Sequence, residues 1–376
     1  MRIDLALYGI SAIFAGVTAF TSSLAPHRAW GAIAAVGYAV ATILSLLPRI
    51  NRLWLAAGTW VAVCLVPLVV QAVQRADGRL DRAQEEVLVI EDGGRRLIES
   101  GTPYLGRDDI AALPDPLLGY LPYQPGMALF GVPRALANVW FTDARVWFAV
   151  ATGVALVAAL RFLPPDPARR LRAFQVATVL PVCALTLATG GDDLPVLALC
   201  LLALALAWCG LPVWAGLAVG AAAALKLFAW PVVLVLAVMF RFRPQFLLPA
   251  IGVPVVTALP ALLLDRAAFM ENVLAFPLGR GLVTSPAASP LPGYLIANNV
   301  PGGRAIALGL LGLAAAAIAV WMWRDPPRNA AEASLFCGVG LLAAMLLLPA
   351  TRFGYLLYPA AFLVWTWVLR TSEERQ

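Results

Sequence analysis

The chain contains few of the side chains from which soluble enzymes usually build active sites. Charged residues make up only 13% of its 376 residues, and it has a single histidine, His27. A soluble domain would carry about a quarter charged residues. One histidine also cannot form a zinc site of the several-histidine type. The composition therefore excludes an ordinary soluble enzyme and a histidine-rich metal centre.

Cysteine is also scarce and never occurs in the spacing that metal and redox sites use. All five cysteines lie in apolar runs, and none forms a Cys-x-x-Cys pair. We interpret them as small packing residues. The sequence predicts no cofactor and no essential metal, although the acidic pair Asp192-Asp193, described below, is a candidate metal site. The formal net charge of +6 lies in short loops without a nucleic-acid-binding pattern, so we expect no nucleic-acid partner.

What the chain has in abundance is apolar sequence. Hydrophobic residues make up 61% of it, and a helix needs roughly 20 apolar residues to cross a bilayer. This predicts an all-α fold, a polytopic transmembrane bundle of about 11–12 spans. The expected spans are Ile3–Ala25, Trp30–Leu47, Leu53–Val73, Arg145–Phe162, Phe174–Thr189, Leu194–Cys209, Val213–Leu227, Pro231–Phe240, Phe246–Leu264, Ala305–Trp323, Ala331–Leu348 and Phe353–Leu369.

Two of these runs, Val213–Leu227 and Pro231–Phe240, are too short to cross. At about 1.5 Å per residue neither reaches a hydrocarbon core of ~30 Å. Pro231 removes a backbone donor between them. We predict half-helices that meet near Lys226, the only lysine of the chain. Irregular backbone at that depth is tolerated only where it lines a cavity or is buried in protein.

The arginines indicate how the chain lies in the membrane, because short cytoplasmic loops are enriched in basic residues. The basic loops are those around Arg49/Arg52, Arg169/Arg170/Arg172, Arg241/Arg243 and Arg324/Arg328. We therefore expect a multi-pass cell-membrane protein with cytoplasmic N- and C-termini. The long loop 74–143 is then extracytoplasmic, as are Asp192-Asp193 and Thr351-Arg352.

The loop 74–143 contains paired acids, Glu85 and Glu86, followed by apolar residues suited to short interfacial helices. A carboxylate that is partly desolvated beside a bilayer can have its pKa raised towards that of a general base. The alternative is a solvated acidic run at the start of a juxtamembrane helix.

The same loop contains a rigid proline–tyrosine segment, Tyr120–Pro125. Its prolines favour an extended backbone. Tyr120 and Tyr123 are candidates to stack on a sugar, and the alternative is an interfacial aromatic belt.

Lys226 is the third candidate, since an ionisable residue within a span is costly and suggests function. We expect an anion such as a lipid phosphate as its partner. Pairing with Asp192 or Asp193 and snorkelling to the interface are the alternatives.

Further polar groups are predicted on the extracytoplasmic side. Asp192 and Asp193 would bind a metal or orient a hydroxyl, unless Asp193 only caps a helix. Arg352, close to Tyr355, would clamp a phosphate, unless it only anchors a helix end.

These elements occur in an order that resembles glycosyltransferase family 87 of the GT-C superfamily. The order is an acidic residue, Gly101-Thr102-Pro103-Tyr104, Tyr120-Leu121-Pro122-Tyr123, and then a span that ends in Lys226 with Pro231 soon after. The family includes actinobacterial polyprenyl-phosphate-mannose-dependent α-1,2-mannosyltransferases. The resemblance runs from about Leu53 to Leu369. It implies two added N-terminal helices in residues 1–52 and a GT-C-like core in residues 53–376.

The resemblance also implies roles for particular residues. The family's catalytic aspartate on the first long loop corresponds to Glu86, with Glu85 as its neighbour. Tyr104, the Tyr-Pro segment and Lys226 correspond to substrate-binding positions. The family often has an aromatic–histidine pair where this chain has Arg352-Phe353-Gly354-Tyr355, so no histidine acts there.

The activity implied is inverting transfer of a hexose or pentose from a polyprenyl-phosphate donor to a glycolipid or cell-envelope polysaccharide. The competing hypotheses are a membrane transporter or lipid flippase, and a scaffold without catalysis. No internal repeat, which transporters often show, is visible in the sequence.

Overall fold

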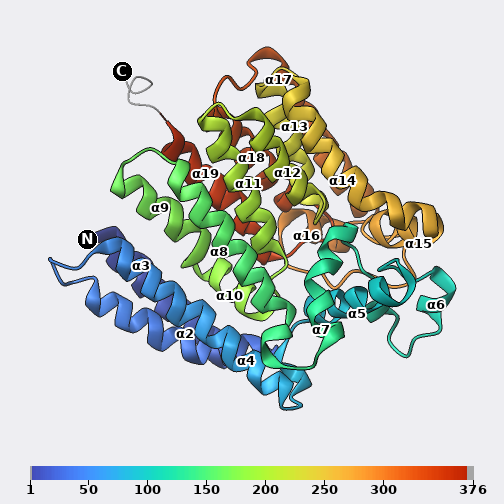
Figure 1. Cartoon of the computed structure of the whole chain (residues 1–376), viewed down its shortest axis with the longest axis horizontal. Helices are drawn as coiled ribbons and strands as arrows, with labels where there is room; N and C mark the ends of the chain where they lie inside the picture. The colour runs from blue at the N-terminus through green and yellow to red at the C-terminus, as the bar shows by residue number, and fades with distance from the viewer. Residues whose placement is uncertain (1, 371–376) are drawn as a thin grey trace. The chain divides into compact units, whose positions relative to one another are not determined.

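The computed structural model describes residues 2–370, and these are predominantly helical (Figure 1). Within this range the only β-type pairing is an isolated bridge between Ala288 and Thr351. The elements up to the first 160 residues are α1 (Arg2–Thr21), α2 (Ala25–Leu44), α3 (Arg52–Trp60), η1 (Val61–Leu65), α4 (Val66–Ala76), η2 (Leu80–Arg82), α5 (Glu85–Ser100), α6 (Arg107–Ala111), η3 (Pro116–Gly119), η4 (Pro125–Gly131), α7 (Val132–Leu136), η5 (Trp140–Thr142) and α8 (Ala144–Phe162). The remaining elements are α9 (Pro167–Thr178), α10 (Pro181–Thr189), α11 (Asp193–Trp208), α12 (Pro212–Ala223), η6 (Leu227–Ala229), α13 (Trp230–Met239), α14 (Pro244–Leu264), α15 (Arg266–Met270), η7 (Glu271–Ala275), α16 (Pro292–Asn299), α17 (Gly303–Arg324), α18 (Ala330–Leu347), η8 (Phe353–Leu356) and α19 (Leu357–Leu369).

The all-α polytopic fold is confirmed, since each of the twelve predicted apolar runs is mostly helical. Six helices of the described chain are long and apolar enough to cross a membrane, or seven if α9 and α10 form one span. Four further apolar helices are shorter, among them α12 and the stretch containing α13. The chain is a multi-pass membrane protein.

The predicted span Phe174–Thr189 is interrupted in the structure. The helix begins earlier, at Pro167, and breaks after Thr178, so that α9 and α10 are bent by 45°. Pro181 begins α10, where its missing N–H would be unpaired in any case. The apolar pattern continues through the break, which explains why hydropathy alone missed it.

The chain divides into two compact units. Unit 1 comprises residues up to 103, 127–155 and 166–195, and unit 2 comprises 104–126, 156–165 and the residues from 196 onwards.

In unit 1, α2 packs against both α1 and the π-helical turn η1. A Cβ at Gly31 would lie 2.6 Å from the Ala15 carbonyl oxygen, so glycine permits the close approach of α1 and α2. The indole of Trp30 donates to the carbonyl of Val63, within η1, at 2.8 Å. The hydroxyl of Tyr38 donates to the Val179 carbonyl at 2.6 Å, at the break between α9 and α10. Irregular helix is thus compensated by buried side-chain donors.

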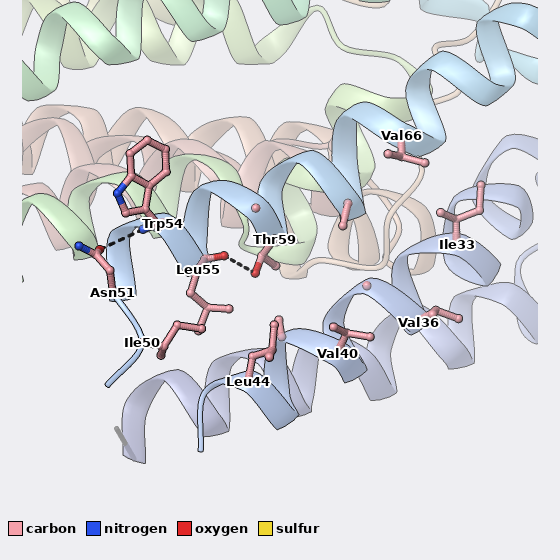
Figure 2. A pocket seen from close by; sticks show the side chains of 14 residues that line it. Ile33, Val36, Val40, Leu44, Ile50, Asn51, Trp54, Leu55, Thr59 and Val66 are labelled. Carbon is pink, nitrogen blue, oxygen red and sulfur yellow. Dashed lines mark hydrogen bonds between the residues drawn. The ribbon is translucent and has the colours of Figure 1, made fainter. Parts of the chain in front are cut away.

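A groove of about 630 Å³ lies between α2 and the α3–η1 stretch and is lined mainly by apolar side chains (Figure 2). Its few polar side chains serve the helix itself. Asn51 caps α3 by accepting from the Leu53 and Trp54 amides, and the Thr59 hydroxyl donates to the Leu55 carbonyl (Figure 2). None of the predicted site residues lines this groove, so it is not the candidate active site.

A buried ion cluster fixes α5, the first long helix of the polar loop. Arg75 at the end of α4 donates to both carboxylate oxygens of Glu91 on α5, at 2.8 and 2.5 Å. It also donates to Asp143 at 3.0 Å, and Arg145 holds the same carboxylate with two bonds of 2.8 Å. All four side chains are at most 7% exposed. The cluster ties α4, α5 and the start of α8 together.

The charges of this cluster compensate one another. Burial alone would raise the pKa of Asp143, but the two arginines, Arg145 first and then Arg75, outweigh it and hold that pKa well below the usual aspartate range. Asp143 is therefore an anion in the folded protein, and removing its charge leaves two buried guanidinium groups with one carboxylate.

In unit 2, α12 packs closely on α14. A Cβ at Gly220 would lie 2.6 Å from the Pro249 carbonyl oxygen, and a Cβ at Gly216 would lie closer still to the Phe246 carbonyl oxygen. Small residues allow two helix backbones to approach in this way. α18 packs in turn on α19 and on α13.

We predict that Asp143→Asn lowers the free energy of unfolding by about 3–5 kcal/mol, because it removes one partner of a buried, hydrogen-bonded charge pair. Asp92→Asn is the matched control, since Asp92 forms an exposed pair with Arg95 on α5 and should cost no more than about 1 kcal/mol. Chemical denaturation in detergent micelles measures both. Equal stability of the two variants would contradict the role assigned to the cluster.

Candidate active site

In unit 1, the two candidate general bases occupy the first turn of α5 and differ in exposure. Gln84 is the N-cap, and Glu85 and Glu86 follow as the first two helical residues. Acidic side chains are favoured there because the helix dipole is positive at its N-terminus. Glu85 is exposed and Glu86 is half-buried. Successive residues of an α-helix point in different directions, so these two neighbouring carboxylates lie on different sides of α5.

Glu86 is directed towards the turn between α10 and α11. A Cβ built on Gly190 would lie 3.9 Å from Oε2 of Glu86. The next residue, Gly191, has a φ of 94°, which favours glycine. Asp192 and Asp193 follow in the same turn and are buried. The structure thus brings Glu86 beside the segment that contains the acidic pair, which makes Glu86 the better placed of the two glutamates.

Asp193 is the first residue of α11, one position further into the helix than the N-cap position predicted for it before Leu194. Within residues 2–370, no group of three or more His, Cys, Asp or Glu side chains is arranged to hold a metal ion.

In unit 2, the predicted helix break at Lys226 is confirmed. α12 ends at Ala223, η6 begins at Leu227, and Lys226 between them is extended, with φ −151° and ψ 144°. The carbonyls of Ala224 and Leu225 accept hydrogen bonds from the amides of Gly126 and Gln124, both at 3.1 Å. The rigid proline–tyrosine segment thus supplies the backbone donors to the break. A Cβ at Gly126 would lie 2.6 Å from the Ala224 oxygen, so this approach depends on glycine.

The same pairing places aromatic rings around the ammonium group of Lys226. Its Nζ lies 5.2 Å from the ring centre of Tyr123, 5.3 Å from that of Tyr355 and 5.6 Å from that of Phe228. These are cation–π distances. Lys226 is only 7% exposed, so its ammonium group does not snorkel to an open surface. Three predicted site residues, from widely separated parts of the sequence, are brought together here.

Tyr104 and Tyr120 are placed differently, because their hydroxyls bind protein. Tyr104 donates to the Tyr123 carbonyl at 2.7 Å and packs edge-on against Phe269. Tyr120 donates to Glu271 at 2.7 Å, accepts from the Leu282 amide at 2.7 Å, and stacks on Phe276. Burial raises the pKa of both phenols, so they stay protonated as donors. Tyr120 is 1% exposed, and its ring is covered by Phe276. Its position suits holding the loop more than stacking on a sugar.

Two residues important for this loop were missed from the sequence, Glu271 and Asn272 in the π-helical turn η7. Arg107 contacts both Glu271 carboxylate oxygens at 2.9 Å. The Asn272 amide accepts from the Leu121 amide at 2.8 Å and donates to the Leu105 carbonyl at 2.9 Å. Their only signal in the sequence is an acid and an amide side by side in an otherwise apolar stretch.

Arg352 is half-buried and is the N-cap residue of the short helix η8, which contains Tyr355. The preceding residue is fixed by backbone pairing, since Thr351 donates to the Ala287 carbonyl at 3.0 Å and accepts from the Ser289 amide at 2.9 Å. Arg352 and Tyr355 thus lie on one short helix, and the backbone pairing of Thr351 fixes the start of that helix.

Comparison with known proteins was informative at the family level. A family model described as glycosyltransferase family 87 matches residues 120–349. The crystal structure of ArnT from Cupriavidus metallidurans in the apo state is similar at 19% sequence identity and a TM-score of 0.47, over 85% of this chain. The match covers only 61% of that chain. No curated protein matches the sequence.

The family match extends over more than half of the 376 residues. It begins at Tyr120 and includes Tyr123, Lys226 and the π-helical turn with Glu271. Glu86 lies before it, and Arg352 and Tyr355 lie just after it. The chain belongs to glycosyltransferase family 87.

Proposed function

We propose that the protein is a membrane glycosyltransferase that moves a hexose or pentose from a polyprenyl-phosphate donor to a glycolipid or cell-envelope polysaccharide. The observation that supports this best is the buried Lys226 in a helix break, surrounded by Tyr123, Phe228 and Tyr355. A cation in such a place suits a lipid-linked anion that enters from the bilayer. The family match over this segment points to a sugar as the transferred group.

In the reaction that we propose, Glu86 accepts the proton of an acceptor hydroxyl. The hydroxyl oxygen attacks the anomeric carbon from the face opposite the phosphate. The bond between that carbon and the phosphate oxygen breaks, and its electron pair leaves with polyprenyl phosphate. A single displacement inverts the anomeric configuration. The half-buried position of Glu86 beside the Gly190–Asp193 turn supports this role, because this turn also contains Asp192 and Asp193, which would orient the acceptor.

Lys226 would stabilise the negative charge that develops on the leaving phosphate. The aromatic rings around it exclude water, which strengthens such an interaction. Arg352 is the second candidate cation, because a guanidinium group can bind a phosphate through two parallel hydrogen bonds. The lipid phosphate itself is the activated leaving group, so the reaction requires no nucleotide and, in this proposal, no cofactor or metal.

The orientation proposed for the chain has both termini in the cytoplasm and the reaction on the extracytoplasmic side. The basic short loops support it through the positive-inside rule. The acidic first turn of α5 and the turn containing Asp192 then face the side where envelope polysaccharides are assembled.

A transporter or lipid flippase is the second candidate, and one observation favours it. Broken helices that surround a buried charge also form substrate sites in transporters, and α12–η6–α13 is such a break. A transporter needs a binding cation at Lys226 but no general base, so the two functions differ in what they require of Glu86.

We predict that Glu86→Gln lowers turnover by about 100-fold or more while donor affinity is kept, since the amide retains the shape but cannot accept the proton. Glu85→Gln is the matched control and should transfer sugar at close to the normal rate, because Glu85 is exposed. Transfer of radiolabelled sugar by purified protein measures both. Normal turnover by Glu86→Gln would show that the proposed base is wrong.

We predict that Lys226→Met weakens binding of the lipid-phosphate donor by about 10–100-fold, the amount expected for loss of one hydrogen bond to a charged group. Methionine keeps the length and apolar packing of the side chain. Arg328→Met is the control, since Arg328 pairs with Asp325 at the exposed start of a helix. Equilibrium binding to the purified variants checks this. Unchanged donor affinity in Lys226→Met would remove the proposed role.

A further inference from the structure

We infer that Gln84 is a positioning residue, which fixes the first turn of α5 and with it the carboxylate of Glu86. The inference rests on the proposed role of Glu86 as the base. Gln84 does not contact the reacting groups in this account. It acts through the helix start that it holds.

Gln84 connects three elements of unit 1. Its backbone amide donates to the Thr189 carbonyl at 3.0 Å. Its side-chain oxygen accepts from the Thr189 hydroxyl at 3.1 Å, and its side-chain nitrogen lies 2.9 Å from Nε2 of His27. His27 is on α2 and Thr189 ends α10. The start of α5 is therefore joined by side-chain contacts to two other helices, α2 and α10.

The choice of glutamine is locally unfavourable, which indicates a role beyond the helix itself. Ser, Thr, Asp and Asn are the preferred N-cap residues because their short side chains bond to the first amides of the helix. Gln84 makes no such cap bond. Its amide is used only between elements, and a residue that departs from local preference is expected where function or tertiary contact requires it.

Gly190 shows how closely Gln84 and Glu86 share this space. A Cβ there would lie 2.7 Å from Oε1 of Gln84 and 3.9 Å from Oε2 of Glu86. A side chain at position 190 would therefore collide with the Gln84 amide, whereas it would only touch the Glu86 carboxylate. If the side-chain amide of Gln84 is lost, the first turn of α5 is held to the end of α10 only by the backbone bond to Thr189, so its distance to the Gly190–Asp193 turn is less well fixed. Arg75 still holds α5 further along at Glu91.

The test is Gln84→Met. This substitution keeps the side-chain length, removes the two side-chain contacts with Thr189 and His27, and leaves the backbone bond to Thr189 in place. We expect kcat for transfer from radiolabelled polyprenyl-phosphate mannose to fall by about 10–100-fold, since a displacement near 1 Å costs up to about 100-fold. KM for the donor should stay unchanged. In a Glu86→Gln background the same substitution should have no further effect on kcat, because Gln84 acts through Glu86.

Thr189 supplies a matched pair of variants. Thr189 and Thr257 both donate to their own helix, and Thr189 alone also reaches a glutamine. Thr189→Val should lower kcat, Thr189→Ser should restore it, and Thr257→Val should leave it normal.

A second readout does not depend on the donor. Amide hydrogen exchange should accelerate in Glu85–Ile90 in Gln84→Met, with α1 and α14 unchanged. Unchanged exchange in that segment would overturn the inference, as would normal kcat in Gln84→Met when Glu86→Gln is inactive. That second result would leave the proposed function intact. Normal turnover by Glu86→Gln would instead overturn the proposed base and this inference together.

Discussion

The candidate site depends on one constraint, that backbone polar groups in an apolar interior must be hydrogen-bonded within the protein. The break between α12 and η6 frees the carbonyls of Ala224 and Leu225, and the amides of Gln124 and Gly126 satisfy them. This pairing has a chemical consequence. It brings the ring of Tyr123 to 5.2 Å from the ammonium of Lys226, the only lysine in the chain. A requirement of membrane folding thereby assembles a desolvated cation within aromatic side chains.

A similar principle acts in unit 1, where buried charge is compensated by buried charge. Arg75, Glu91, Asp143 and Arg145 form a dry cluster that holds α5 by its middle. Such clusters are weak evidence for net stability, but removing one partner is costly. Gln84 holds the start of the same helix. Glu86 lies between these two attachments, so a side chain in a surface loop acquires a defined position, as an acid–base group needs.

The sequence was sufficient for the class of fold and for the break at Lys226, because hydropathy and proline placement act locally. It was also sufficient for the family, since the Tyr-Pro segment and Lys226 with Pro231 lie within the matched residues. It could not separate Glu86 from Glu85, because one helical position decides which carboxylate turns towards Gly190.

The sequence also did not show several features that depend on tertiary structure. It missed the break after Thr178, where apolar residues continue on both sides. It also missed Arg75 with Asp143, which are 68 residues apart, and Glu271, whose partners are more than 150 residues away. Such pairs are created by tertiary structure and have no spacing rule. The catalytic and binding roles proposed for all of the site residues, Glu86 and Lys226 included, stay predictions.

The most direct test of the central claim is incubation of the purified protein with a panel of polyprenyl-phosphate sugars and an extract of envelope glycolipids. Mass spectrometry then measures released polyprenyl phosphate and the newly glycosylated acceptor. A glycosyltransferase should release polyprenyl phosphate from at least one donor and form glycosylated acceptor in equal amount. Binding of donors without release from any of them would contradict glycosyl transfer and favour a transporter.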